Sequence, residues 1–143
     1  MNKMKKIFLG ILRVIVLIVL MIWQLPQFVV GWILSYIISG DHCEIHNGIM
    51  FIYSPFMSGG ISLGNVVILN LFYYKDDDLK IEKHETGHAI QSLILGPLYI
   101  FVIGIPSLVW TILYGWLIKE TPNGYYKFYT ERWADKLGGV VRK

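Results

Sequence analysis

Five consecutive residues near the middle of the chain have the types and spacing of a zinc site: His84-Glu85-Thr86-Gly87-His88. On a helix, His84 and His88 are four residues apart and share one face. Two imidazoles placed in this way can bind one Zn²⁺ through bonds of about 2.0–2.1 Å. Glu85 lies beside that face, where it can take a proton from a water whose pKa zinc lowers to about 7. Gly87 would leave room for a substrate backbone beside the metal, or for the packing of a neighbouring element.

A third ligand must come from elsewhere, because a catalytic zinc ion usually has three protein ligands and an open position. Glu131 and Asp135 are the candidates, since they lie four residues apart on one face of a predicted helix. Glu131 can bind the metal. Asp135 can accept a hydrogen bond from the free ring nitrogen of a histidine ligand, which fixes the tautomer and orientation of that ring.

The two motifs, H-E-x-x-H followed downstream by E-x-x-A-D, resemble those of the gluzincin clan of zinc metallopeptidases. The second motif is more similar to that of the membrane gluzincins, the group of the CAAX prenyl protease and the membrane heat-shock protease. The whole chain resembles small bacterial membrane proteins with H-E-x-G-H-x-x-Q-S, L-G-P-L and E-x-W-A-D, here at 84–92, 95–98 and 131–135. The resemblance implies a zinc helix, a glutamate helix and the hydrolysis of peptide bonds.

The same resemblance implies how a substrate would be held. Gluzincins generally bind an extended substrate against a sheet edge beside the zinc helix, and residues 61–70 are the candidate for that edge. Gluzincins also stabilise the oxyanion with a side chain. Tyr125, Tyr126 and Tyr129 are candidates for this role, because they lie close to Glu131 in the sequence.

The composition predicts contact with a membrane. Of the 143 residues, 55% are hydrophobic and 16% are charged, whereas a soluble domain carries about a quarter charged residues. A lipid bilayer is the simplest shield for this apolar excess. The net charge of +3 is too small to indicate binding to nucleic acid, and the length suits a single domain over residues 1–143.

The first apolar run, residues 7–40, is predicted to be a membrane anchor. Residues 14–40 carry no charge, and basic residues precede the run. One span of about 20 residues fits comfortably and two full spans do not. The run is too long for a signal peptide. Pro26 interrupts it, so the anchor is either a kinked span or a shallow helical hairpin. Gln24 and Gln27 flank the break, where they line a cavity or bond each other.

Residues 41–75 are predicted to form a small β-sheet. Asn47-Gly48 between apolar neighbours is a strong signal for a two-residue hairpin, with residues 50–53 as its second arm. Residues 61–72 are rich in Val, Ile and Leu and predict a further strand.

Two helices should carry the metal ligands. Residues 76–95 predict the zinc helix, which the acidic run 76–78 opens at its positive end and Gly96-Pro97 closes. Residues 125–137 predict the amphipathic glutamate helix.

The apolar segment 97–118 separates these helices and constrains the topology. A single membrane crossing there would place the two halves of the metal site on opposite sides. Gly104 and Pro106 therefore suggest a re-entrant or interfacial hairpin. The alternative is that the histidine helix itself enters the membrane. Basic residues dominate both ends of the chain, which predicts an active site on the cytoplasmic face of a bacterial membrane.

The predicted fold class is a mainly α membrane protein with a small β-sheet. The predicted function is a membrane-embedded zinc metalloendopeptidase that acts at or near the membrane surface on a peptide or protein substrate. A non-catalytic zinc protein with an immunity, scaffold or regulatory role stays open, as does an intramembrane protease of the site-2 type. A homo-oligomer also stays open, because a short chain could need a second copy to enclose an active site.

A second group of potential metal ligands lies near the predicted hairpin. His42, Cys43 and His46 lie close together in sequence, but their spacing does not match a common zinc motif. Residues that flank a hairpin are the better interpretation of all three.

Overall fold

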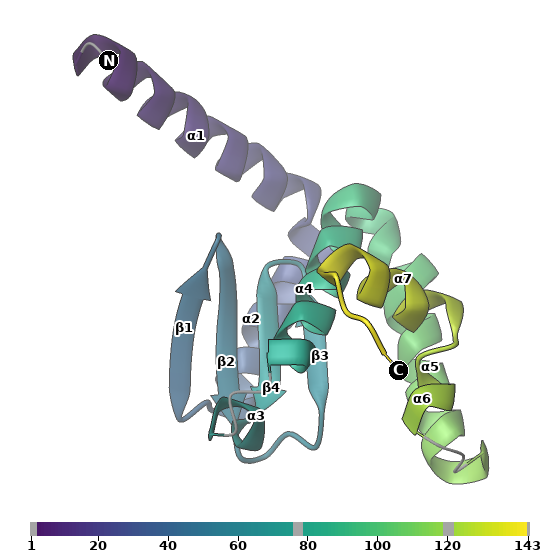
Figure 1. The fold of residues 1–143 in the computed structure, drawn as a ribbon. Coiled ribbons are helices and arrows are strands. Elements are labelled where there is room, and N and C mark those ends of the chain that lie inside the picture. Colours follow the sequence, from purple (N-terminus) through teal and green to yellow (C-terminus); the bar gives the residue numbers. More distant parts are fainter. Residues whose placement is uncertain (1–2, 76–78, 119–121, 143) are drawn as a thin grey trace.

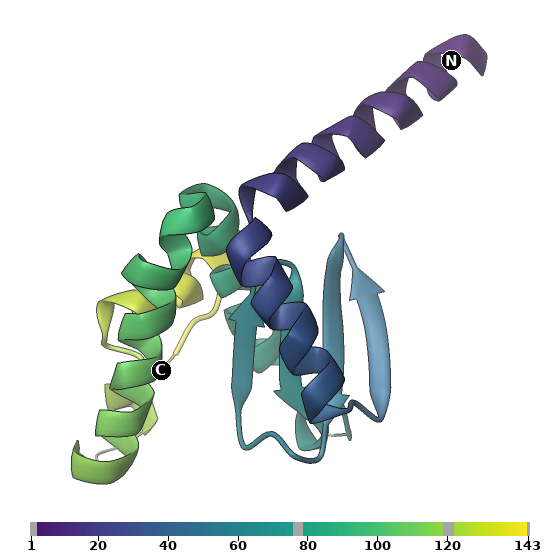
Figure 2. The same cartoon turned by 180° about the vertical axis from the view of Figure 1, so that it is seen from behind.

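The computed structural model describes residues 3–75, 79–118 and 122–142. It is mostly helical, with one four-stranded sheet in the described part of the chain, which confirms the mainly α fold with a small sheet. Helix α2 covers one face of the sheet and helix α4 the other, while α1 projects away from this body (Figures 1 and 2).

The first apolar run forms two helices, α1 (Lys3–Trp23) and α2 (Leu25–Ile38), that meet at Gln24. Pro26 stands in the first turn of α2, where its missing N–H is tolerated. No residue of α1 is buried, whereas α2 packs against the sheet through side chains that include Phe28 and Leu34. The break predicted near Pro26 is therefore present, and it separates a free helix from one that packs on the sheet.

The sheet has the strand order β1-β2-β4-β3. Strands β1 (His42–His46) and β2 (Ile49–Ser54) form the predicted hairpin, and its turn residues Asn47 and Gly48 have φ values of 53° and 82°. Positive φ at both central residues is what a type I′ hairpin turn requires.

The expectation of one strand over residues 61–72 is wrong. The segment forms a second hairpin, β3 (Gly60–Leu63) and β4 (Val66–Asn70), and the chain then enters α3 (Leu71–Lys75). Gly64 provides the turn with a φ of 66°. Strand β4 pairs with β2 on one side and β3 on the other, so β4 is internal, while β1 and β3 lie at the two edges of the sheet.

The two faces of the sheet pack against different helices. Phe51, Tyr53, Val67 and Leu69 form a core with Ile81 of α4 (Leu79–Leu95). On the opposite face, a second core that includes Ile52 and Ile68 packs against α2. Both faces of β4 are thus buried, which explains its unbroken apolar sequence. The acidic run 76–78, predicted to open the zinc helix, lies outside the described residues.

Helices α4 and α7 (Tyr129–Gly138) pack closely along their length. A Cβ atom at Gly87 would overlap the carbonyl of Ala134, and one at Gly138 would overlap the carbonyl of Lys83. Of the two roles considered for Gly87, close helix packing is therefore the one that the structure supports.

The predicted re-entrant hairpin at Gly104 and Pro106 is absent. After a 3-10 turn, η1 (Gly96–Leu98), the chain forms one continuous helical rod from η2 (Ile100–Gly104) through α5 (Ile105–Leu113) to η3 (Tyr114–Ile118). The π-helical turn η2 ends at Gly104, and Pro106 stands in the first turn of α5, where the missing N–H of proline is tolerated.

The chain returns alongside the rod, so the two halves of the metal site meet even though residues 97–118 form no hairpin. Beyond the rod, α6 (Pro122–Tyr125) brings the chain back beside α5, where the indole N–H of Trp110 donates to the carbonyl of Tyr125 at 2.9 Å. The rod and the segment leading to α7 therefore lie side by side (Figure 1).

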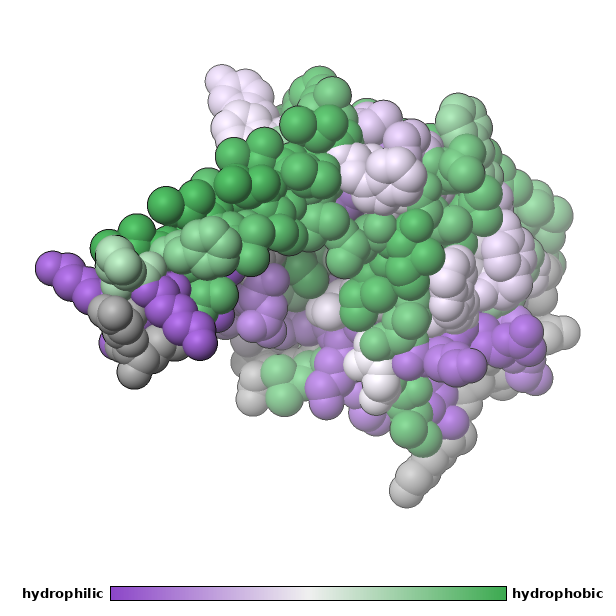
Figure 3. Space-filling model, turned by 90° about the horizontal axis from the view of Figure 1, so that it is seen from above, coloured by the Kyte–Doolittle hydropathy of each residue, from purple (hydrophilic) through white to green (hydrophobic). Residues whose placement is uncertain are grey.

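Two helices in the described residues have the length and hydropathy of a membrane span, Lys3–Trp23 and Ile100–Leu117. Both are almost entirely unburied within the protein. In Figure 3 the projecting arm of α1 is hydrophobic along most of its surface and hydrophilic at its free end.

A buried set of neutral polar side chains joins the α1–α2 junction to the end of α4. Gln27 donates from Nε2 to the Ser92 hydroxyl at 3.0 Å and to the Gly96 carbonyl at 2.9 Å, and Ser92 donates to Gln24 Oε1 at 2.8 Å. We call Gln24, Gln27 and Ser92 the glutamine cluster. The two glutamines thus meet through Ser92, not through a bond to each other.

Candidate metal centre

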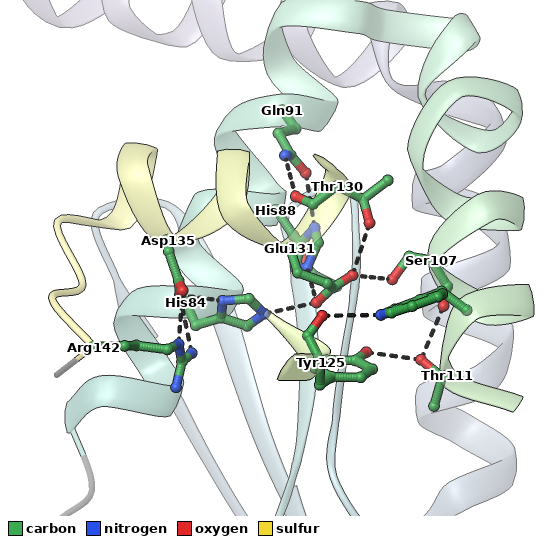
Figure 4. Close-up of polar contacts among 12 residues, drawn as sticks. His84, His88, Gln91, Ser107, Thr111, Tyr125, Thr130, Glu131, Asp135 and Arg142 are labelled. Atoms are coloured by element: carbon green, nitrogen blue, oxygen red, sulfur yellow. Dashed lines mark hydrogen bonds and ion pairs between the residues drawn. The ribbon is translucent and has the colours of Figure 1, made fainter. Parts of the chain in front are cut away.

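Two helices bring the predicted site residues together. Helix α4 supplies His84 and His88, and α7 supplies Glu131 and Asp135 (Figure 4). Helix α4 also supplies Glu85. All five side chains are buried. Because α4 and α7 are far apart in sequence, their close packing at Gly87 is what makes the site possible.

The imidazoles of His84 and His88 point at the same carboxylate oxygen. Their Nε2 atoms lie 3.1 and 3.4 Å from Oε2 of Glu131. In a tetrahedral zinc site with bonds of about 2.0–2.1 Å, neighbouring ligand atoms lie about 3.3–3.4 Å apart. The three groups form the one candidate metal-binding cluster found in the described residues, with ligand atoms within 4.8 Å of one another. The donor set fits zinc.

The other ring nitrogens of the histidines are already engaged. His84 Nδ1 lies 2.7 Å from Oδ1 of Asp135, and His88 Nδ1 lies 2.7 Å from Oε1 of Gln91. An Nδ1–H donated to each of these oxygens leaves the Nε2 lone pair free to bind a metal. The structure thus brings Asp135 to its predicted position and identifies His84 as its partner. Gln91 was missed, although it lies three residues after His88 on the same helix.

The carboxylate of Glu131 is held from its second oxygen. Ser107 of α5 donates a hydrogen bond to Oε1 at 2.5 Å, and Thr130 donates to the same atom at 3.0 Å. Gln91 completes this arrangement by donating from Nε2 to the Thr130 carbonyl at 2.9 Å. Oε2 of Glu131 is therefore the atom left to face the histidines. No short-range sequence signal points to Ser107, because it lies on a separate apolar helix.

Glu85 has a different environment. Its Oε2 atom is buried and has no hydrogen-bond partner among the described residues. A buried carboxylate oxygen without a partner is rare and calls for a ligand or a water that satisfies it. Gly60 of β3 lies against the same carboxylate, and a Cβ atom there would overlap Oε1. This position beside the ligands suits a base that accepts a proton.

Electrostatics separate the two glutamates. Burial raises the pKa of the Glu85 carboxyl, and the charges of His88 and His84 offset only part of that rise. Burial acts in the same direction on Glu131, but the adjacent imidazoles of His84 and His88 outweigh that effect and hold the pKa of this carboxyl well below its ordinary value. The lowered pKa of Glu131 suits a ligand that stays ionised, while the raised pKa of Glu85 suits a group that accepts a proton.

The tyrosines considered for the oxyanion are placed differently. The hydroxyl of Tyr125 bonds Thr111 at 2.8 Å, and that of Tyr129 donates to the Val102 carbonyl at 2.6 Å. Tyr126 alone among them packs on a ligand, with its ring centroid 5.2 Å from that of His84.

His42 and His46 share Glu44 on β1, at 3.0 and 2.7 Å, and lie apart from the metal-binding cluster. Cys43 is exposed. All three lie within β1, the first arm of the hairpin, so the expectation that they flank the hairpin is wrong.

No family model, curated protein or solved structure matches this chain. The interpretation of the site therefore rests on its own geometry.

Proposed function

We propose that this protein is a membrane-embedded zinc metalloendopeptidase in which His84, His88 and Glu131 hold the metal. One observation carries the proposal. Two Nε2 atoms converge on one carboxylate oxygen at 3.1 and 3.4 Å, while every other polar atom of these three side chains is engaged elsewhere. Such an arrangement orients lone pairs toward a single point, as a metal site requires.

The bound ion would supply Lewis acidity, which activates a water and polarises a carbonyl. Glu85 would take the proton of the attacking water on its unpartnered Oε2 atom and pass it to the leaving amine. Asp135 and Gln91 would hold the two imidazoles in place through the reaction.

An extended peptide would lie along β3, which is an edge strand. This revises the expected substrate edge, because β4 is internal and cannot receive another strand. Tyr99 donates to the Ser62 carbonyl at 2.9 Å, which occupies that part of the edge. Gly60 is exposed and lies against Glu85, so the peptide would pass the base at this residue.

Membrane embedding is supported by the two unburied apolar helices. A second candidate, cleavage inside the bilayer, is favoured by Ser107, which lies near the middle of the helix Ile100–Leu117 and bonds Glu131. If that helix spans the membrane, the metal lies at bilayer depth. We propose a location in a bacterial cytoplasmic membrane with the site opening to the cytoplasm, and depth measurements on a spin label at exposed Ile112 would distinguish the two candidates.

The competing function is a zinc protein without peptidase activity, in an immunity, scaffold or regulatory role. The test uses purified protein in lipid nanodiscs with a library of unstructured and membrane-anchored peptides, read by mass spectrometry. We expect cleavage that a chelator stops and zinc restores. Glu85→Gln should retain zinc and lose about 10²–10⁴-fold in rate. Equal cleavage by Glu85→Gln would contradict the mechanism, and a zinc-loaded parent that cuts nothing would favour the competing function.

A further inference from the structure

The chain that follows α7 turns back onto the metal centre. Gly139 ends the helix in the left-handed region with a φ of 71°, and its N–H donates to the carbonyl of Asp135. The N–H of Val140 donates to the same carbonyl at 2.8 Å. These bonds form a helix C-cap that reverses the chain and directs residues 140–142 toward the last turns of α7.

Arg142, at the end of this segment, donates two hydrogen bonds to the carboxylate of Asp135. Its Nε–H donates to Oδ2 at 2.6 Å and its Nη2–H donates to Oδ1 at 2.9 Å (Figure 4). The guanidinium also stacks over the ring of Tyr126, 3.1 Å from the centroid. A bidentate hydrogen bond of this kind fixes the plane of a carboxylate, which a single hydrogen bond does not.

The carboxylate of Asp135, which Arg142 binds, also orients a metal ligand. Oδ1 of Asp135 accepts from Arg142 and also lies 2.7 Å from Nδ1 of His84. The terminal torsion of an aspartate is soft, so the carboxylate could rotate if the histidine alone held it. Arg142 removes that freedom and thereby sets the direction of the His84 ring.

Tyr126 contacts the same histidine. Its ring stands edge-to-face with His84, with centroids 5.2 Å apart and planes at 84°. Arg142 therefore contacts two of the groups that contact His84, namely Asp135 and Tyr126. A surface ion pair would be worth little, but this pair holds a carboxylate that is 8% exposed.

We propose that Arg142 is a positioning residue of the metal centre, which fixes Asp135 so that His84 directs Nε2 at the metal. The inference rests on the proposed zinc site. It assigns to the segment after α7 a role in metal affinity, and it predicts that Arg142 acts through Asp135 and not through the fold as a whole.

The test compares Arg142→Gln and Arg142→Lys with the control Arg132→Gln. Arg132 lies on the exposed face of α7, so its replacement makes the same charge change away from the site. Zinc affinity is measured by chelator competition on the full chain in detergent, and ligand geometry by the absorption spectrum of the Co²⁺ form. We expect Arg142→Gln to bind zinc about tenfold more weakly, at the low end for residues behind a ligand. Arg142→Lys should restore part of the loss, and Arg132→Gln should match the parent.

A double-mutant cycle with Asp135→Asn isolates the pathway. Arg142→Gln should have no further effect on zinc affinity in the Asp135→Asn background. Additive effects, or an Arg142→Gln variant with parental affinity and Co²⁺ spectrum, would overturn the inference. Thermal unfolding of the metal-free variants identifies a purely structural role, which would lower the melting temperature and leave the affinity unchanged. A parent that binds no zinc would instead refute the proposed function, and this inference with it.

Discussion

Helix α4 carries two buried polar clusters, one at its middle and one near its C-terminal end, and the two clusters differ in chemistry. The metal cluster, which we define as His84, His88 and Glu131, contains three ionisable groups whose free atoms converge on one point. The glutamine cluster contains only neutral side chains, which bond one another and the backbone near Gly96. Both are withdrawn from water, so burial of polar groups alone does not distinguish them.

The two clusters differ in whether their polar atoms are bonded to neighbouring groups or left free. In the glutamine cluster the donors bind helix ends, and Trp23 adds a further bond from its indole N–H to the Leu93 carbonyl at 3.0 Å. That cluster fastens α1 and α2 to α4. In the metal cluster the surrounding residues occupy every atom except those that face the centre. The convergence of several unshared lone pairs on one point therefore marks the metal centre, whereas the glutamine cluster leaves a single buried oxygen, Gln27 Oε1, without a hydrogen-bond partner among the described residues.

The largest effect on the metal cluster is expected from Gly87→Ala. The added methyl group overlaps the Ala134 carbonyl, so α7 must move away from α4 and carry Glu131 with it. Zinc affinity should fall by more than about 100-fold, beyond the loss typical of residues behind a ligand. Chelator competition measures the loss. Gly115→Ala is the control, because a Cβ atom there meets nothing within 4 Å.

A matched pair of substitutions tests the two clusters directly. Gln91 and Gln27 are both fully buried, and Leu replaces either with little change in volume. Gln91→Leu removes the acceptor that orients His88 and should weaken zinc binding about 10–100-fold. A parental zinc affinity for this variant would show that the contact between Gln91 and His88 does not support the metal.

A smaller effect, confined to turnover, is expected from Gly60→Ala. The methyl group would displace the Glu85 carboxylate and leave the three ligands in place. Turnover should fall about tenfold, less than the roughly 10²–10⁴-fold that the loss of a general base costs, and zinc affinity should not change. Gly59→Ala, whose Cβ atom meets nothing within 4 Å, should cleave at the parental rate. Equal rates for both variants would show that Gly60 has no role in positioning the Glu85 carboxylate.

The smallest effect on the metal is expected from Gln27→Leu, the partner of the Gln91 variant. It leaves the Ser92 hydroxyl and the Gly96 carbonyl without their donor, which should destabilise the fold by about 1–3 kcal/mol. Zinc affinity should stay at the parental value. Denaturant unfolding and chelator competition measure the two quantities, and a loss of zinc affinity would show that the clusters are coupled along α4.

Short-range patterns predicted what local chemistry determines. The H-E-x-x-H spacing placed two imidazoles on one helix face, and Asn47-Gly48 gave the observed hairpin because both residues accept positive φ. The pairing of Glu131 with the histidines was also predictable, since the motif implies a third ligand. Asp135 follows from the same argument.

The rest depends on contacts that the sequence does not reveal. Residues 61–72 are apolar on both faces, so their periodicity hid the turn at Gly64. Pro106 resembled a chain break, but the preceding π-helical turn absorbs it within a continuous helix. Ser107 and Arg142 reach the centre from segments without a motif, and only tertiary packing identifies them.

The central claim is that α4 and α7 together hold one metal ion, and zinc content under chelator competition tests it most directly. The parent and Glu131→Gln are purified in detergent and exposed to the same dilute chelator. We expect the parent to keep about one zinc per chain, as a three-ligand site should, and the variant to lose it readily. If both retain zinc equally, Glu131 is not a ligand and the proposed centre between α4 and α7 is wrong.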